Sequence, residues 1–324
     1  MRNLFAVLMA GGLTFGSMAA AQGVSNGLTS AYFSQPAYEG PATRVKIGYG
    51  RMINNDLIGE LRDRWQTASY TSSRVMGNDW NGEMPSDIGS LLEYRLQTKI
   101  IAPGDVENPV PNDRLYSTSV SLGAHTHFSV GPGEVSLGGD VVITGPMTGL
   151  ADLQYFVHDI INRDVPSAST KADMIPNGFH PGLVAEFGRP IALSNAAEIR
   201  PFAEVRTGDE TLIRSGVDFY FGGIVDNDLL VRDQVTGQRY RTVRGDTLPG
   251  YGFIVGGDFA AMGSSIYLPD RGPDMTDQRT RLRAGVMWQG DANSVFYGMT
   301  WLSKEFDTQE ESQFVGSLRL NFEF

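Results

Sequence analysis

Apolar and polar residues alternate along most of the chain. The clearest example covers residues 92–100, where Leu92, Tyr94 and Leu96 alternate with Glu93 and Arg95. Side chains of a strand point in turn to its two faces, so a period of two predicts a strand and not a helix. The same alternation predicts eleven further strands, at residues 45–52, 65–75, 115–128, 135–143, 183–187, 198–206, 212–221, 253–261, 282–288, 295–303 and 314–324.

The connections between these segments are of two kinds. Residues 130–133 and 290–293 form tight turns, whereas residues 144–179 form a long connection. An even number of strands with short turns at one end and long loops at the other is typical of transmembrane β-barrels. Lipid cannot satisfy open backbone groups, so a sheet that crosses a membrane must close. The pattern therefore predicts an all-β fold, an antiparallel twelve-stranded outer-membrane barrel. A secreted β-sandwich is the alternative that shares this alternation.

The two ends of the chain suggest export. Arg2, an apolar run at 4–10 and small residues at 17–21 predict a signal peptide cleaved after Ala21. Residues 22–324 would then form a single barrel domain in the bacterial outer membrane. The last predicted strand alternates up to Phe324, and it resembles the terminal strand of outer-membrane proteins. That resemblance implies the outer-membrane assembly machinery as a partner.

Composition narrows the classes of function. The 324 residues carry a formal net charge of −11 without a basic cluster, which argues against a nucleic-acid partner. The chain contains no Cys, which excludes thiolate zinc sites, a Cys nucleophile and disulfides.

One candidate site lies between the first two predicted strands. Asn55 and Asp56 end the first strand, and Asp63 and Thr67 flank the start of the second. A hairpin brings these ends together, and such oxygen ligands suit a hard cation such as Ca²⁺. The alternative is ordinary loop polarity, because Asn and Asp populate turns for backbone reasons.

A second candidate lies in the long connection 144–179. Leu150, Leu153, Val157 and Ile161 form an apolar stripe with helical spacing, which predicts a helix over 150–162. Gln154 and His158 lie one turn apart on another face. A histidine in an extracellular loop suits a general base, although a lone helical histidine is also an ordinary surface or packing residue.

Two further features attract attention. His125 and His127 point to one face near the turn 131–133, and we interpret them as residues of the barrel wall or lumen. Segment 224–250 contains a predicted turn at 235–238, which suggests a small extra hairpin on the periplasmic side.

Together these residues resemble the LpxR-like lipid A 3′-O-deacylases. The similarity rests on Asn55-Asp56, on the run from Asp63 to Thr67, on Gly145-Pro146, and on Gln154 and His158, with support from segments 112–114 and 304–306. Some positions depart from the family pattern: Ser69 stands where relatives often have Gly, and residues 177–179 replace Asn-Glu-Pro.

The resemblance implies a twelve-stranded barrel that uses Ca²⁺ to hydrolyse the ester of the 3′-linked acyloxyacyl group of lipid A. His158 would activate water, and Asn55 and Asp56 would be polar groups of the cation and oxyanion region. Thr67 would supply a neighbouring hydroxyl, with Gln154 and Asp164 supporting the helix. The alternative function is a non-enzymatic barrel, either a narrow channel or a structural or adhesion protein.

Overall fold

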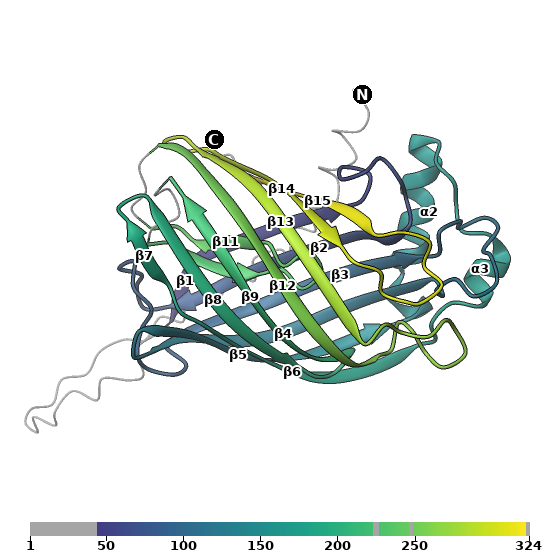
Figure 1. Ribbon diagram of the computed structural model, residues 1–324, viewed down its shortest axis with the longest axis horizontal. Helices are drawn as coiled ribbons and strands as arrows, with labels where there is room; N and C mark the ends of the chain where they lie inside the picture. The colour runs from purple at the N-terminus through teal and green to yellow at the C-terminus, as the bar shows by residue number, and fades with distance from the viewer. Residues whose placement is uncertain (1–43, 223–226, 246–248, 322–324) are drawn as a thin grey trace, which may run out of the picture.

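A closed antiparallel β-barrel forms the body of the molecule (Figure 1). The computed structural model describes residues 44–222, 227–245 and 249–321, so the predicted signal peptide and Phe324 lie outside the described residues. In the barrel wall, strands that follow each other in the sequence pair with each other, and the barrel closes where β1 pairs with β15. The exception is the four-residue β7, which lies in the β6–β8 connection, so β6 pairs directly with β8. The predicted fold class is confirmed.

Twelve strands build the barrel wall: β1 (Val45–Asn55), β2 (Trp65–Gly77), β3 (Leu91–Ala102), β4 (Ser117–Val130), β5 (Gly133–Thr144), β6 (Gly178–Gly188), β8 (Ala197–Arg206), β9 (Glu210–Phe221), β12 (Gly250–Ser265), β13 (Gln278–Gln289), β14 (Ser294–Leu302) and β15 (Gln313–Asn321). The short β7 covers Ile191–Ser194.

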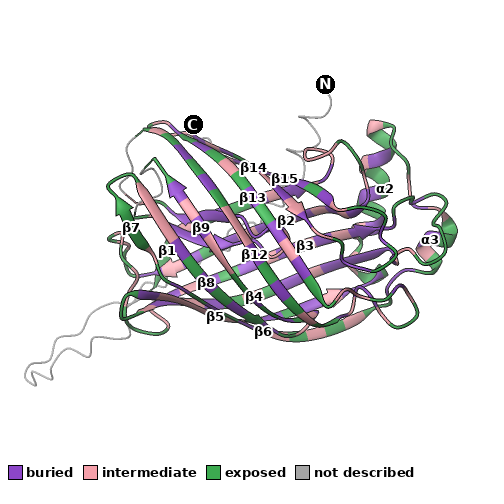
Figure 2. Cartoon of the chain, viewed as in Figure 1, coloured by how far each residue is buried: buried purple, intermediate pink, exposed green. Residues whose placement is uncertain are grey.

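The barrel is polar inside and apolar outside. On β3 the charged positions Glu93, Arg95 and Lys99 are buried in the lumen, while Tyr94 between them is exposed on the outer face. Buried and exposed positions alternate in the same way along the other strands (Figure 2). A sandwich would bury its apolar faces, so this inverted arrangement identifies a barrel of the outer-membrane type.

Ion pairs join the charged side chains on the lumen face of the wall. Arg283 on β13 bonds both Asp218 on β9 and Asp258 on β12, and on β3 the Arg95 guanidinium contacts Glu93 of the same strand at 2.8 Å. Buried charges persist only when they are paired and hydrogen-bonded, so these networks are the lumen's equivalent of a core.

His125 and His127 also point into the lumen, as predicted. They contact Asp140 at 3.1 Å and Glu93 at 2.8 Å, respectively. Each histidine therefore has a carboxylate partner in the wall of the barrel.

Segment 224–250 contains the expected hairpin, but the hairpin lies inside the barrel. Its strands are β10 (Leu229–Arg232) and β11 (Arg239–Val243), and every residue of both is buried. The connection leaves β9 at the end where β1 begins, and the hairpin folds back along the lumen (Figure 1). The prediction of a periplasmic position is therefore corrected: both faces of the hairpin are covered by the barrel wall.

Polar side chains at the hairpin tip hold it in place. The Asp233 carboxylate accepts hydrogen bonds from Asn54 on β1 and Thr71 on β2, both at 3.0 Å. On the opposite side, Gln238 donates to the Ala284 carbonyl at 3.1 Å. The tip thus connects strands from both halves of the barrel.

Close packing brings the hairpin against β1. A Cβ at Gly50 would lie 2.6 Å from the Arg241 carbonyl, so only glycine fits at that position. The hairpin therefore occupies much of the lumen over this length.

The long connection after β5 carries a 3₁₀ turn, η1 (Pro146–Thr148), and two helices, α2 (Leu150–Ile161) and α3 (Ala168–Ala172). The predicted helix is confirmed, with its polar face inward: Ala151, Gln154 and His158 are its buried residues. In the described part of the chain, no helix is long and apolar enough to cross a membrane. Since short turns of outer-membrane barrels are periplasmic, the helical end is the extracellular one.

Candidate active site

The β1–β2 connection folds around the carboxylate of Asp56. This side chain is fully buried and accepts a hydrogen bond from the Arg64 backbone N–H at 2.6 Å. The Asp56 backbone N–H donates to the Thr67 carbonyl at 3.2 Å, and Thr67 itself is 2% exposed. The structure therefore brings the predicted residues Asp56 and Thr67 together at the extracellular end.

Asn55 has a different part in this loop. Strand alternation buries Asn54 in the lumen, where it contacts the hairpin tip, and leaves Asn55 half-buried. The Asn55 side-chain oxygen accepts a hydrogen bond from the Leu57 backbone N–H at 2.8 Å. This Asx turn shapes the chain immediately after Asp56.

Helix α2 presents His158 and Gln154 to the same region. The His158 Nδ1 lies 2.6 Å from the Asp164 carbonyl oxygen, which can only accept, so Nδ1 carries the proton and donates. Asp164 thus supports the histidine, as the resemblance implies, but through its main chain. Gln154 accepts a hydrogen bond from the Tyr116 hydroxyl at 2.5 Å, and its amide lies 3.4 Å from His158 Nε2. The helix side of the site is fixed in orientation, and the unprotonated Nε2 accepts a hydrogen bond from the Gln154 amide.

Asp63 is the partner of His158 that the sequence did not assign. Its Oδ2 lies 3.2 Å from His158 Nε2, and it links the helix to the β1–β2 connection. The sequence placed Asp63 in the motif without giving it a role. Only the tertiary fold shows that helix α2, about a hundred residues later, meets this carboxylate.

The surroundings of Asp56 and Asp63 disfavour the charged form of both carboxyl groups. Burial is the largest influence on Asp56 and, together with the neighbouring charges of Asp63 and Glu60, raises its pKa to about 9. Burial also raises the pKa of Asp63, against the opposing effects of His158 and the nearby Thr67 hydroxyl. Such environments disfavour a second negative charge unless a cation lies between the groups.

The oxygens present here fit a calcium ion. Within the described residues, Asp56 Oδ1, Asp63 Oδ1 and Thr67 Oγ are buried and have no hydrogen-bond partner. Nowhere in that part of the chain do three or more His, Cys, Asp or Glu side chains gather in an arrangement that could hold a metal ion. A cation here would therefore be held by two carboxylates and neutral oxygens, the donor type that Ca²⁺ accepts.

The two supporting motif segments meet above the lumen. Arg114 forms an ion pair with Glu305, and Phe306 packs edge-on against Trp65 with ring centroids 6.4 Å apart. Burial would raise the pKa of Glu305, but Arg279 and Arg114 lower it to about 2. This charged and aromatic layer closes the barrel beside the candidate site.

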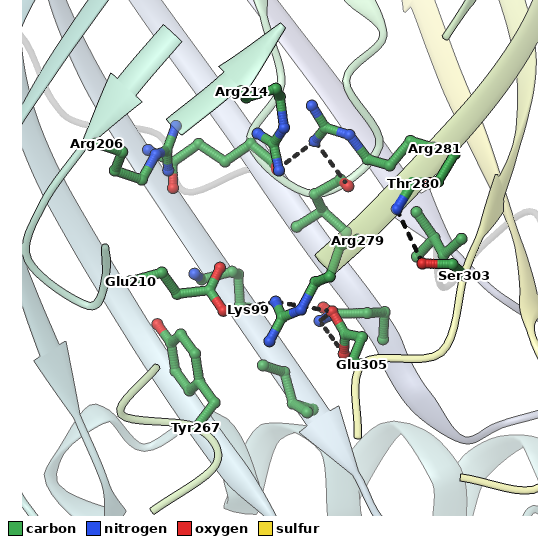
Figure 3. Close-up of a pocket in the computed structure, with 15 residues that line it drawn as sticks. Lys99, Arg206, Glu210, Arg214, Tyr267, Arg279, Thr280, Arg281, Ser303 and Glu305 are labelled. Carbon is green, nitrogen blue, oxygen red and sulfur yellow. Dashed lines mark hydrogen bonds and ion pairs between the residues drawn. The ribbon is translucent and has the colours of Figure 1, made fainter. Parts of the chain in front are cut away.

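A cavity of about 40 Å³ lies deeper in the lumen, among Lys99, Arg206, Arg214 and Arg279 (Figure 3). It is lined by none of the predicted site residues. These cations are paired with carboxylates; Lys99, for example, contacts Asp209 at 2.7 Å. The cavity therefore belongs to the ion-pair network of the lumen and not to the candidate site.

The structure is similar to solved barrel structures, to different degrees. LpxR from Salmonella typhimurium superposes with a TM-score of 0.70 at 16% sequence identity, covering 85% of this chain and 100% of that chain. The translocator domain of the autotransporter NalP from Neisseria meningitidis matches with a TM-score of 0.36 at 10% identity, covering 86% and 88% of the two chains. No protein-family model and no curated protein matches the sequence. The likeness to LpxR from Salmonella typhimurium shows the same barrel fold, and the apolar outer face of the barrel agrees with the predicted outer-membrane location.

Proposed function

We propose that this barrel is an outer-membrane ester hydrolase that removes the 3′-O-linked acyloxyacyl group of lipid A with the help of Ca²⁺. The observation that carries the proposal is the pairing of His158 Nε2 with Asp63 at 3.2 Å, beside the buried Asp56 and Thr67. The fold shared with LpxR supports the same function.

His158 has the geometry of a general base. Because Nδ1 donates to the Asp164 carbonyl, Nε2 is the nitrogen that accepts a proton from water. The Asp63 carboxylate lies 3.2 Å from the same Nε2, so its charge would stabilise the imidazolium that forms there, while the Asp164 carbonyl on Nδ1 orients the ring. Gln154, held by Tyr116, keeps the ring in place.

Asp56, Asp63 and Thr67 are the residues that would hold the cation, with the second lone pair of the Asn55 oxygen as a further donor. Bound Ca²⁺ supplies Lewis-acid stabilisation of the charge that develops on the ester oxygen. The location at the extracellular rim suits a substrate that is itself a membrane lipid, since the ester would not have to leave the bilayer.

The lumen argues against the channel alternative. The buried β10–β11 hairpin and the ion pairs around it occupy the space that a solute would need. A structural or adhesion protein is the alternative that the test below separates from the enzyme.

The test compares lipid A from cells that express the wild-type chain or His158→Ala. Mass spectrometry should show loss of the 3′ acyloxyacyl group only with wild type. His180→Ala is the matched control, because His180 lies at the same end of the barrel and contacts Thr144 instead of the site. Unchanged lipid A with a folded wild-type barrel, or equal deacylation by His158→Ala, would overturn the proposal.

A further inference from the structure

Helix α2 turns an apolar surface away from the protein. Leu153, Phe156 and Ile160 follow each other at spacings of three and four residues and are 53%, 62% and 51% exposed. They lie on the side of the helix opposite to Gln154 and His158. The ring of neighbouring Tyr155 makes a cation–π contact with Lys171 of α3, whose Nζ lies 4.8 Å from the ring centroid. The stripe is therefore a distinct face.

A further exposed apolar side chain, Leu61, lies in the β1–β2 connection on the other side of the site. Leu61, two residues before Asp63, is 77% exposed and has a φ of 62°, a region that leucine rarely adopts. Its loop folds back over the outer wall, because the Ile58 carbonyl accepts a hydrogen bond from the outward-facing Tyr297 hydroxyl at 2.9 Å. A Cβ at Gly316 on β15 would lie 2.6 Å from the same carbonyl. The loop thus sits on the membrane side of the barrel and holds Leu61 outward.

The surface of α2 continues the lipid-facing wall. Phe179, the uppermost outward residue of β6, is 67% exposed, and Leu183 below it is 69% exposed. Met147, 44% exposed, is tied to this point because its backbone N–H donates to the Asn177 side chain at 2.9 Å. Helix α2 starts three residues after Met147. Apolar surface therefore runs from the barrel wall through η1 to the helix.

We propose that the outward face of α2 and Leu61 are immersed among the acyl chains of the outer leaflet. Leu61 lies two residues before Asp63, whereas the stripe on α2 lies on the side of the helix opposite to His158, so the helix would hold the candidate catalytic pair at the level of the acyl chains. An amphipathic helix with this pattern rests in a membrane interface with its apolar face buried. This inference concerns the position of the helix in the membrane and stands apart from the activity, so each can fail without the other.

Because the chain contains no Cys, a single introduced cysteine carries a spin label at one known place. The variants Phe156→Cys and Leu61→Cys test the two surfaces, and Asp173→Cys, an exposed acidic position at the C-terminal end of α3, is the water-facing control. Leu183→Cys reports the lipid-facing wall. Each full-length labelled barrel is reconstituted into phosphatidylcholine vesicles, and folding is checked by heat-modifiable migration.

Power saturation measures the accessibility of each label to oxygen, which concentrates in lipid, and to a water-soluble nickel chelate. Labels at 156 and 61 should match the label at 183, with high oxygen and low nickel accessibility, while the label at 173 should show the reverse. Equal nickel accessibility at 156 and 173 would overturn the proposal, because the helix would then lie in water. Low accessibility to both reagents at 156 would also overturn it, because protein and not lipid would cover the face. Ile160→Cys replaces Phe156→Cys if that variant does not fold.

Discussion

The raised pKa of Asp56 makes calcium binding depend on pH. With a pKa of about 9, Asp56 is protonated at neutral pH, and an ion that binds its carboxylate must release that proton. The apparent affinity is scaled by the deprotonated fraction, about 1/300 at pH 6.5 and about 1/4 at pH 8.5. We therefore expect the calcium affinity to rise by about 80-fold between these two pH values. Deprotonation of Asp63, whose pKa is also raised, would steepen the rise.

Isothermal titration calorimetry on the calcium-free barrel in detergent measures this dependence. Titrations in buffers of different ionisation enthalpy count the protons released, and we expect about one per ion below pH 8.5. Asp56→Asn is the control, since it should bind more weakly and lose most of the dependence on pH. An affinity that is constant from pH 6.5 to 8.5 in the wild type would refute the assignment of Asp56 as a ligand.

Two further predictions concern the lumen and the candidate site. Arg232→Met removes the contacts of β10 with Glu186 at 2.7 Å and Asp218 at 2.9 Å, and should lower the free energy of unfolding by about 3 kcal/mol. Urea unfolding in lipid vesicles measures this free energy. The control is Arg271→Met, which breaks an exposed ion pair, and a loss in Arg232→Met no greater than in this control would contradict the prediction. Asp63→Asn should slow lipid A deacylation at least ~100-fold, because the neutral amide lacks the charge that would stabilise the imidazolium and binds a cation more weakly than a carboxylate does. Time-resolved mass spectrometry measures the rate, and a rate equal to wild type would show that Asp63 takes no part.

The sequence was most informative where one periodicity covered a whole element. Alternation at residues 92–100 predicted β3, and the helical spacing of the apolar residues within 150–162 predicted α2. The internal hairpin could not be predicted in place. Its strands are four and five residues long and buried on both faces, so they carry no alternation that shows which side faces water.

The candidate site could be predicted only in part for a similar reason. Asp56, Thr67, Gln154 and His158 were identified from local spacing and from a family resemblance, and the structure places them at one end of the barrel. The role of Asp63 depends on a contact with a helix far along the chain. The contribution of Asp164 is a main-chain carbonyl, which any residue type offers, so its side chain gave no signal.

The internal hairpin restricts the routes by which the barrel can be assembled. It lies between β9 and β12 in the chain, yet it packs against β1, and within the described residues β1 pairs with β15 over Ile53–Asn55. A folded hairpin of buried charges has no route through a finished wall. It must therefore take its place either before the first and last strands meet or through the end of the barrel at which its connection leaves β9, and in both cases the folded polypeptide encloses its own insert.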